Sequence, residues 1–305
     1  MKNHKLIFTN GAFFTTEGRM TDELPLRGEI YEELKHCAVN NVPRKISNIV
    51  ELLKLTVRVE DFPPEPDQIC LANGTLFLDG SFEEGKPKIV RNRFPVAYNP
   101  EAPRPEVWLS FLEELLYPED IPTLQEYIGY CLIPSNKGQR MMVIKGEGGE
   151  GKSQIGAVLA KLFGRNMKDG SIGKISENRF ARADLEHILL CIDDDMRMEA
   201  LRQTNYVKSI VTAQGKMDLE RKGQQSYQGW MFARLLAFSN GDLPPLKPRS
   251  FSEALIACQS RYKLEYCNNV TNAAGRRVRG FMGIQILVRN NMTAFPGDSL
   301  RTYVP

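Results

Sequence analysis

The sequence predicts an α/β fold for residues 139–250, preceded by a smaller mixed α/β region. Three observations lead to this prediction. An apolar, strand-like run at residues 141–144 is followed by a glycine-rich loop and then by apolar residues at helical spacing. Two further apolar runs of strand length follow, at residues 188–192 and 235–238. Gly164 supplies a helix stop after these apolar residues at helical spacing. They are Ile155, Val158, Leu159, Leu162 and Phe163.

Length and composition are those of an ordinary globular protein. The chain has 305 residues, of which 42% are hydrophobic and 25% charged, enough for one large or two modest domains. No apolar run approaches the ~18 residues of a spanning helix, and the first residues lack a secretory signal, so we expect a cytoplasmic protein with no membrane contact. The net charge of +3 names no partner, but it allows nucleic acid if the basic residues cluster.

The cysteines and histidines do not suggest a metal cage or a disulfide framework. The six cysteines are scattered singly, without a C-x-x-C pair, and the chain has only three histidines. We therefore expect no structural metal at these residues and reduced, mostly buried thiols. The cysteines are Cys37, Cys70, Cys131, Cys191, Cys258 and Cys267.

Residues 1–64 contain short mixed elements, and their role stays open. They end in the proline-rich stretch EDFPPEPDQ, whose composition is typical of a turn or linker. After this stretch, Asn73 and Gly74 lie between two apolar, strand-like runs, which is the strongest short-range signal for a β-hairpin. We therefore place a domain boundary at residue 64.

The second region, residues 65–138, is expected to add two helices after the hairpin. One helix ends at Pro118, and the other covers residues 122–133. Apolar stripes usually mean packing, so we expect both helices to form a packed module that leads into the α/β domain. The stripe of the first helix consists of Trp108, Phe111, Leu112, Leu115 and Leu116.

The glycine-rich loop, GEGGEGKS, fits the pattern G-x-x-x-x-G-K-[ST] of a phosphate-binding loop. Backbone N–H groups of such a loop surround a β-phosphate, Lys152 reaches the β- and γ-oxygens, and Ser153 binds Mg²⁺. The alternative is a flexible linker, which the strand before the loop and the helix after it disfavour. We therefore predict a P-loop NTPase that binds ATP and Mg²⁺. The binding residues are Gly146, Glu147, Gly148, Gly149, Glu150, Gly151, Lys152 and Ser153.

A second strand is expected to deliver carboxylates beside the loop, because Mg²⁺ needs oxygen ligands and the attacking water needs orienting. Asp193, Asp194 and Asp195 follow the apolar run at residues 188–192, and Asp193 lies 41 residues after Lys152. We assign Asp193 to the metal and Asp194 to water activation. Two alternatives stay open: the pair Asp194 and Asp195, or a solvated acidic turn.

The third apolar run ends in Ser239 and Asn240. A polar side chain at this place could hydrogen-bond the γ-phosphate or the attacking water, and we assign that role to Asn240. Taken alone, the triplet Ser-Asn-Gly is most often a turn. It gains meaning as the third member of an ordered set of loop, acidic strand and polar strand end.

A basic stretch lies between the second and the third of these strands. It contains Lys208, Lys216, Arg221 and Lys222, with turn-like breaks at Gln214-Gly215 and Lys222-Gly223. A basic hairpin of this kind would suit a nucleic-acid backbone. A solvated charged loop is the ordinary alternative.

The ordered set resembles the superfamily 3 helicases, and within them the phage and plasmid primase-helicases related to the poxvirus primase-helicase. The resemblance covers residues 65–250 and includes the loop, the strand LLCIDDDM, the segment VKSIVTAQGKMDLERKG and the strand FARLLAFSNGDLPP. It implies an AAA+-type domain that assembles into a homo-oligomeric ring, commonly a hexamer, and moves on single-stranded DNA at a replication fork. It further implies a bacterial host cell, possible contact with other replication proteins, and DNA contacts from Lys208, Arg221 and Lys222.

The resemblance fails in two places. We find no polymerase-type primase module before the helicase part. After Ser250 the family pattern expects Gly-Phe and then paired arginines, one of which reaches the neighbouring subunit's nucleotide as a finger. Arg261 could substitute by position, whereas Arg276 and Arg277 come late and have no Gly-Phe before them. We therefore predict a divergent basic tail at residues 251–305, with nucleotide binding intact and turnover impaired.

Two other functions compete with a helicase. A truncated remnant would bind nucleotide and DNA without unwinding. A different P-loop motor, such as a packaging or partition ATPase, would share the loop but not the ring on single-stranded DNA.

Overall fold

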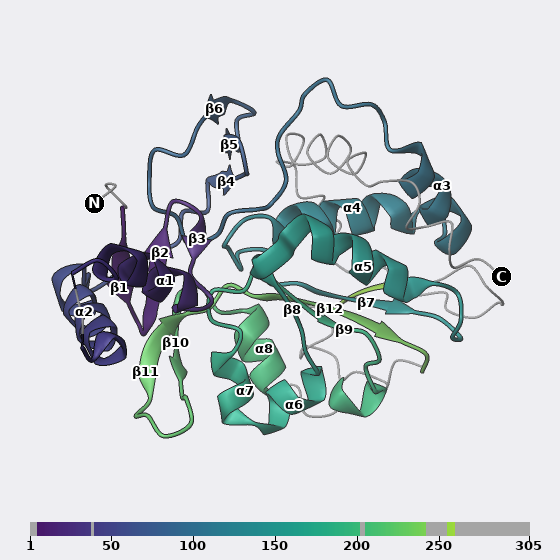
Figure 1. Cartoon of the computed structure of the whole chain (residues 1–305). Coiled ribbons are helices and arrows are strands. Elements are labelled where there is room, and N and C mark those ends of the chain that lie inside the picture. The colour runs from purple at the N-terminus through teal and green to yellow at the C-terminus, as the bar shows by residue number, and fades with distance from the viewer. Residues whose placement is uncertain (1–4, 38–39, 202–204, 242–254, 260–305) are drawn as a thin grey trace. The chain divides into compact units, whose positions relative to one another are not determined.

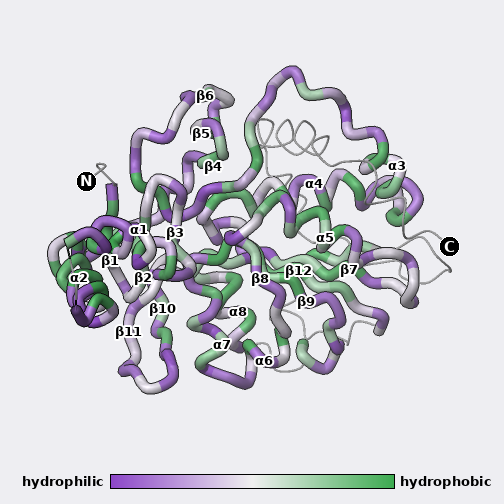
Figure 2. The backbone as a smooth tube through the Cα atoms, viewed as in Figure 1, coloured by the Kyte–Doolittle hydropathy of each residue, from purple (hydrophilic) through white to green (hydrophobic). Residues whose placement is uncertain are grey.

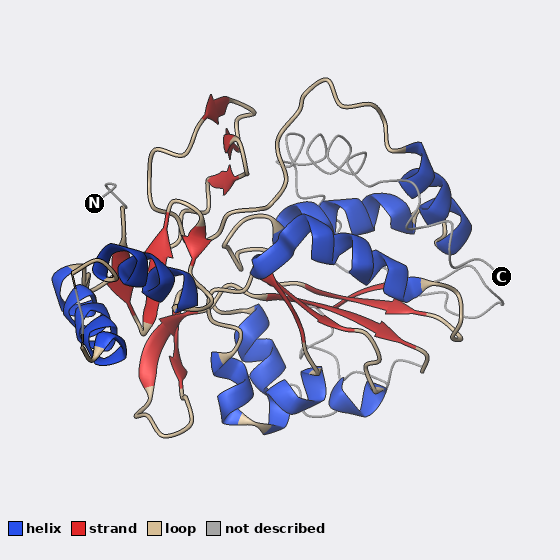
Figure 3. Ribbon diagram, in the orientation of Figure 1, coloured by secondary structure: helices blue, strands red, loops and turns tan. Residues whose placement is uncertain are grey.

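The computed structural model describes residues 5–37, 40–201, 205–241 and 255–259, which fall into two compact units (Figures 1 and 3). The first unit contains the described residues up to Pro64, together with Gly85–Arg93. The second contains Glu65–Glu84 and the described residues from Phe94 onward. The edge at Pro64 lies within the proline-rich stretch that suggested a boundary.

The first unit combines a small antiparallel sheet with two helices. Its first hairpin turns at Asn10 and Gly11, whose φ angles of 48° and 76° are those of the tight turns that favour Asn-Gly. Phe13, Phe14 and Val50 are buried and form its core. The elements are β1 (Ile7–Thr9), β2 (Ala12–Thr15), β3 (Gly18–Arg19), α1 (Leu24–Leu34) and α2 (Val42–Thr56).

The second unit begins with the predicted hairpin, but its turn lies one residue earlier than Asn-Gly suggests. Leu71 and Gly74 exchange backbone hydrogen bonds of 2.7 and 3.3 Å, so the turn residues are Ala72 and Asn73. A Cβ on Gly74 would overlap the Glu83 carbonyl oxygen, so this glycine serves the close approach of the next strand. The strands are β4 (Gln68–Cys70), β5 (Gly74–Phe77) and β6 (Phe82–Glu84).

The two helices expected next are confirmed as α3 (Glu106–Leu115) and α4 (Asp120–Cys131). Trp108, Leu112 and Leu115 of α3 are buried in one core cluster with residues of α4 and of the sheet that follows. The fully buried Arg234 donates to the Cys131 carbonyl oxygen at the end of α4 and at 3.2 Å to that of Ser135. The packed module is therefore part of the second unit's core.

The main sheet of the second unit has five parallel strands in the order β13-β7-β12-β9-β8, so the fold is mixed α/β. The strand that precedes the glycine loop, β7, lies beside β12, and β12 separates it from the acidic strand β9. The strands are β7 (Met141–Lys145), β8 (Met167–Asp169), β9 (Leu190–Asp193), β12 (Arg234–Ser239) and β13 (Leu255–Gln259).

Helices cover both faces of this sheet, with α4 and α5 on one face and α6, α7 and α8 on the other (Figure 1). Alternate residues of each strand enter two separate cores. In β7, Met142 and Ile144 join the cluster with α4 and α5, whereas Met141 and Val143 join the one with α6 and α8. The central strands are accordingly hydrophobic on both faces (Figure 2). The helices are α5 (Lys152–Phe163), α6 (Ile172–Glu177), α7 (Arg179–Ala183) and α8 (Asn205–Val211).

The sheet continues past residue 250, into the segment that the sequence assigns to the tail. β13 pairs with β7 in parallel over its whole length, from Leu255↔Met141 to Gln259↔Lys145. At least this part of residues 251–305 is therefore a structural strand. Arg261, Arg276 and Arg277 lie outside the described residues, so the expected arginine finger does too.

Of the five cysteines that the structure describes, Cys37 is exposed and the other four are buried, as the sequence predicts. Burial raises the pKa of the Cys131 thiol to about 11 and that of Cys191 to about 12. Within the described ranges, no helix has the length and apolar character needed to cross a membrane.

Candidate functional site

Three neighbouring parallel strands end at the same edge of the main sheet, and each carries one part of the predicted site. β7 ends at Lys145 and leads into the glycine loop, β9 ends at Asp193, and β12 ends at Ser239. The Gly146 N–H donates to the Ser239 carbonyl oxygen at 2.9 Å, which ties the start of the loop to the end of β12. The fold thus brings together segments that lie far apart in the sequence.

The loop has the backbone that its glycines allow. Gly148, Gly149 and Gly151 have φ angles of 101°, 79° and 94°, in the left-handed region that residues with a Cβ rarely adopt. α5 then begins directly at Lys152. The glycines are therefore required by the path of the chain, and the loop ends at the positive N-terminus of a helix.

Lys152 makes the central contact of the site. Its Nζ donates to the Glu150 carboxylate and, at 2.9 Å, to Oδ1 of Asn240, the residue just after β12. Only 7% of the Lys152 side chain is exposed. Two of the predicted site residues, Lys152 and Asn240, are therefore in direct contact although they are 88 residues apart.

The Glu150 carboxylate lies inside the loop, a placement that the sequence did not predict. One oxygen accepts from the Glu147 N–H, and the other accepts from Lys152 and, at 3.2 Å, from the Gly148 N–H. The Glu150 side chain is only 3% exposed. A Cβ on Gly146 would overlap this ion pair. The first glycine therefore makes room for the two charged groups.

The three aspartates after β9 have different surroundings. Asp193 is buried, and its Oδ2 accepts the Ile172 N–H at 2.7 Å, at the start of α6. Burial raises the pKa of the Asp193 carboxyl, and the N–H groups of Ile172 and Asp195 act in the opposite direction. Asp194 and Asp195 are exposed, as is Ser153 in the first turn of α5. Which two aspartates form the active pair stays a prediction.

The basic stretch contains a two-stranded antiparallel hairpin, β10 (Lys216–Leu219) with β11 (Tyr227–Trp230). Its tip turns at Gly223, with a φ of 77°, where the Gln224 N–H donates to the Arg221 carbonyl oxygen at 3.0 Å. Lys222 is exposed at this tip, and Lys208 is exposed on α8. Two of the three predicted DNA contacts are therefore accessible.

The third, Arg221, lies in the same turn, but its side chain is only one-third exposed and pairs with a buried carboxylate. Its Nη2 donates to Oε2 of Glu186 at 2.8 Å, and the Tyr227 hydroxyl donates to the same oxygen at 2.6 Å. The Glu186 side chain is fully buried and lies just before β9. Glu186 was not predicted from the sequence, although two polar residues, Glu186 and His187, directly before an apolar run were a visible signal.

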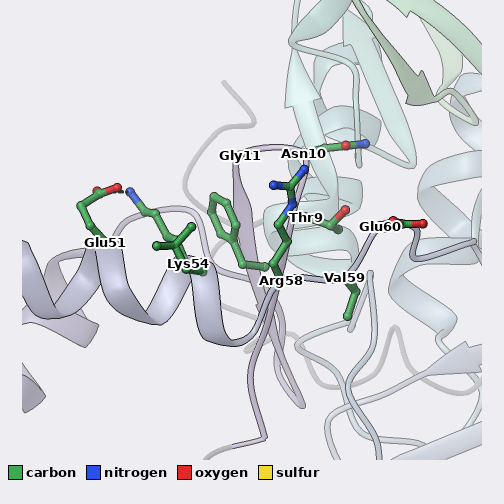
Figure 4. Close-up of a pocket in the computed structure, with 10 residues that line it drawn as sticks. Thr9, Asn10, Gly11, Glu51, Lys54, Arg58, Val59 and Glu60 are labelled. Carbon is green, nitrogen blue, oxygen red and sulfur yellow. Dashed lines mark hydrogen bonds and ion pairs between the residues drawn. The ribbon is translucent and has the colours of Figure 1, made fainter.

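The N-terminal unit has an open pocket of about 520 Å³ between its first hairpin and α2 (Figure 4). Lys54 points at Glu51 and pairs with it at 2.9 Å, and Arg58 and Glu60 add one charge of each sign. These mixed charges define no ligand class. The remaining lining residues are Phe8, Thr9, Asn10, Gly11, Leu55 and Val59.

Two family comparisons match different parts of the chain. Residues 4–116 match the family described as D5 N terminal like. The matched segment includes most of residues 1–64, whose role the sequence left open. Residues 144–253 match a family of unknown function, DUF5906. The first match supports a relation to primase-helicases. No curated protein sequence matches the chain significantly.

Solved structures share the fold. The A form apo structure of the NrS-1 C terminal region is 13% identical, with a TM-score of 0.55 over 97% of this chain and 67% of that one. A second apo structure of this region, residues 305–718, is 13% identical, with a TM-score of 0.56 over 96% and 67%. A further A form apo structure of residues 305–718 is 13% identical, with a TM-score of 0.54 over 95% of this chain and 65% of that one. The chain thus spans about two thirds of the length of these structures.

Proposed function

We propose that this chain is the ATPase part of a replication helicase of the superfamily 3 type. It binds ATP and Mg²⁺ at the loop before α5 and single-stranded DNA at the β10–β11 hairpin. The D5 N terminal like match and the similarity to the NrS-1 C terminal region support a replication role. The strand order, with β12 between β7 and β9, supports the AAA+ type of sheet.

The observation that carries the proposal is the meeting of Lys152 and Asn240 at the glycine loop. A lysine at the start of a helix and a polar side chain from the neighbouring strand can both reach a γ-phosphate. Lys152 would neutralise the phosphate oxygens, and Asn240 would orient the terminal phosphate or the attacking water. Bound Mg²⁺ would supply further charge neutralisation, and Ser153 and Asp193 would hold it.

The hairpin supports the DNA half of the proposal. Lys222 lies at an exposed tip, and Lys208 and Lys216 add exposed positive charge nearby in the sequence. Phosphate backbones are bound mainly through such side chains. Asp194 would activate water, and single-stranded DNA and further copies of this chain in a ring would be the partners.

Replacing Lys152 tests the nucleotide site. We expect Lys152→Ala to weaken ATP binding by at least about 100-fold, because charge-assisted contacts to phosphate are lost. Titration calorimetry with ATP and Mg²⁺ measures the effect. The matched control is Lys161→Ala, an exposed lysine on the same helix, which leaves ATP affinity unchanged. An ATP dissociation constant that survives Lys152→Ala would contradict the proposal.

A second candidate, a remnant that binds nucleotide and DNA without unwinding, is favoured by the sequence after Ser250. That sequence lacks a Gly-Phe followed by paired arginines, which the resemblance leads us to expect; its paired arginines, Arg276 and Arg277, come before its Gly-Phe at residues 280–281. Single-stranded DNA added to the ATPase assay separates the two functions. Stimulated turnover, together with a ring in sedimentation experiments, supports the helicase. Retained ATP binding without stimulated turnover supports the remnant.

A further inference from the structure

The donors of the glycine loop are already occupied by an anion from the chain itself. The Glu150 carboxylate accepts from the N–H groups of Glu147 and Gly148 and from the Lys152 ammonium. With 3% and 7% of their side chains exposed, Glu150 and Lys152 form an ion pair that is almost closed to solvent. Glu150 therefore satisfies the polar groups of the loop from inside.

These donors are the groups that a phosphate would need. Backbone N–H groups and a lysine at a helix N-terminus bind an anion through its charge and its acceptor oxygens. A carboxylate offers the same two properties on a smaller scale. Because both anions need Lys152 and the same N–H groups, they cannot occupy the loop together.

We propose that Glu150 sets the nucleotide affinity of this site by competing with the incoming polyphosphate. In the nucleotide-free protein its carboxylate takes the place of the phosphate, and it must leave before Lys152 can reach a ligand. This inference rests on the proposed function, because it assigns a role to Glu150 at the same loop.

The local backbone lets the side chain leave without disturbing the fold. Glu150 lies between Gly149 and Gly151, and the residues on its N-terminal side, Glu147 to Gly149, are exposed. The hydrogen bond from Lys152 to Asn240 does not involve Glu150, so it can persist when Glu150 turns outward. The apparent dissociation constant is the intrinsic value divided by the fraction of molecules whose loop is open. A strong ion pair keeps that fraction small.

Two replacements test the competition. We expect Glu150→Gln, which removes the charge but keeps an acceptor oxygen, to tighten ATP binding about tenfold, as an open fraction of roughly one tenth implies. Glu150→Ala removes both and is expected to tighten it at least as much. Titration calorimetry with ATP and Mg²⁺, repeated with inorganic pyrophosphate as a probe of the phosphate site alone, measures both effects.

The matched control is Glu126→Gln, because it removes the same charge from an exposed position on α4, outside the loop. Its ATP affinity is expected to change less than about twofold, since a solvated charge acts weakly. Unchanged or weaker binding of both ligands by the Glu150 variants overturns the inference. If the wild type binds ATP and Lys152→Ala does not, the proposed nucleotide site survives that outcome. If the wild type fails to bind ATP, the proposed function fails with it.

Discussion

Two buried carboxylates in the second unit each pair with a cation, but their surroundings differ. Glu150 lies in the glycine loop and pairs with Lys152, whereas Glu186 lies before β9 and pairs with Arg221. Glu186 also accepts the Tyr227 hydroxyl, and a Cβ on Gly229 would come within 2.9 Å of its Oε1. Its surroundings are therefore side chains and backbone of the hairpin, together with the His187 ring, whose Nε2 lies 3.6 Å from Oε1. The surroundings of Glu150 are loop N–H groups and a lysine.

The difference shows that one type of interaction, a buried ion pair, can be a contact that a ligand replaces or a permanent contact of the fold. A ligand phosphate can replace the Glu150 carboxylate, because it offers the same charge to the same donors. No phosphate can replace Glu186, whose partners are a hydroxyl and a guanidinium fixed on one hairpin. We therefore expect removal of the two carboxylates to have opposite consequences: tighter ligand binding at Glu150 and a less stable protein at Glu186.

The largest effect on stability is expected for Glu186→Gln. Breaking a buried, hydrogen-bonded ion pair leaves the remaining cation without its partner, which typically costs about 3 kcal/mol. Urea denaturation measures the change in the free energy of unfolding. Arg221→Ala is expected to show a loss of similar size, because it leaves the fully buried Glu186 carboxylate with only the Tyr227 hydrogen bond.

The control for Glu186→Gln is Glu220→Gln on the same hairpin. Glu220 pairs with Arg179 at 3.1 Å, but 65% of the arginine side chain is exposed. An exposed pair of this kind contributes at most about 1 kcal/mol. If the two variants unfold at the same urea concentration as the wild type, Glu186 is no anchor and the comparison with Glu150 fails.

Periodicity and glycine positions were enough to predict the elements around the candidate site. Local patterns predict the strands β7, β9 and β12 with their polar ends. They also predict the helices α3, α4 and α5. Lys152 and Asn240 were assigned to one site as members of an ordered set of loop, acidic strand and polar strand end. They are in contact, because parallel strands end at one edge of the sheet. These features depend on neighbours in the sequence or on the direction of a strand.

Other features could not be predicted, because they depend on partners that only the fold supplies. β13 pairs with β7 across more than 100 residues, and its short apolar run, Leu255 to Cys258, does not by itself indicate which strand it joins. The positions of the Glu150 and Glu186 carboxylates follow from the shape of the loop and of the hairpin. Arg221 was predicted to contact DNA because its partner, Glu186, lies 35 residues away and the ion pair between them is not visible in the sequence.

Lys222→Ala tests the exposed lysine of the hairpin turn against the neighbouring Arg221, which pairs with the buried Glu186. We expect weaker binding of single-stranded DNA and a slope of log K against log salt that is about 0.7 shallower, because one phosphate contact is lost. Stability in urea should stay at the wild-type value, unlike that of Glu186→Gln. Fluorescence anisotropy over a salt series measures the slope. Lys161→Ala on α5 is the control. An identical slope for both variants would mean that the tip is a solvated turn without a DNA contact.

The smallest effect is expected at Asp193, a third buried carboxylate. Burial raises its pKa in the folded protein above the unfolded value near 3.8, so the folded state binds more protons between these two pKa values. The folded protein therefore loses stability as the pH rises through this window. Asp193→Asn removes the charge and keeps an oxygen that can accept the Ile172 N–H. We expect its melting temperature at pH 7 to rise by about 2 °C, with a difference that vanishes below pH 3.8.

The matched control is Asp194→Asn, because Asp194 is exposed and should leave the melting temperature unchanged. Calorimetric scans without nucleotide, taken across acid to neutral pH, separate the two variants. Both are expected to lose Mg²⁺-dependent ATP hydrolysis, since one would hold the metal and the other would activate water. A fall in stability for Asp193→Asn at pH 7 would mean that the ionised carboxylate is an anchor like Glu186. A rise would mean that the ionised carboxylate destabilises the folded protein, as expected of a charge that serves a ligand instead of the fold.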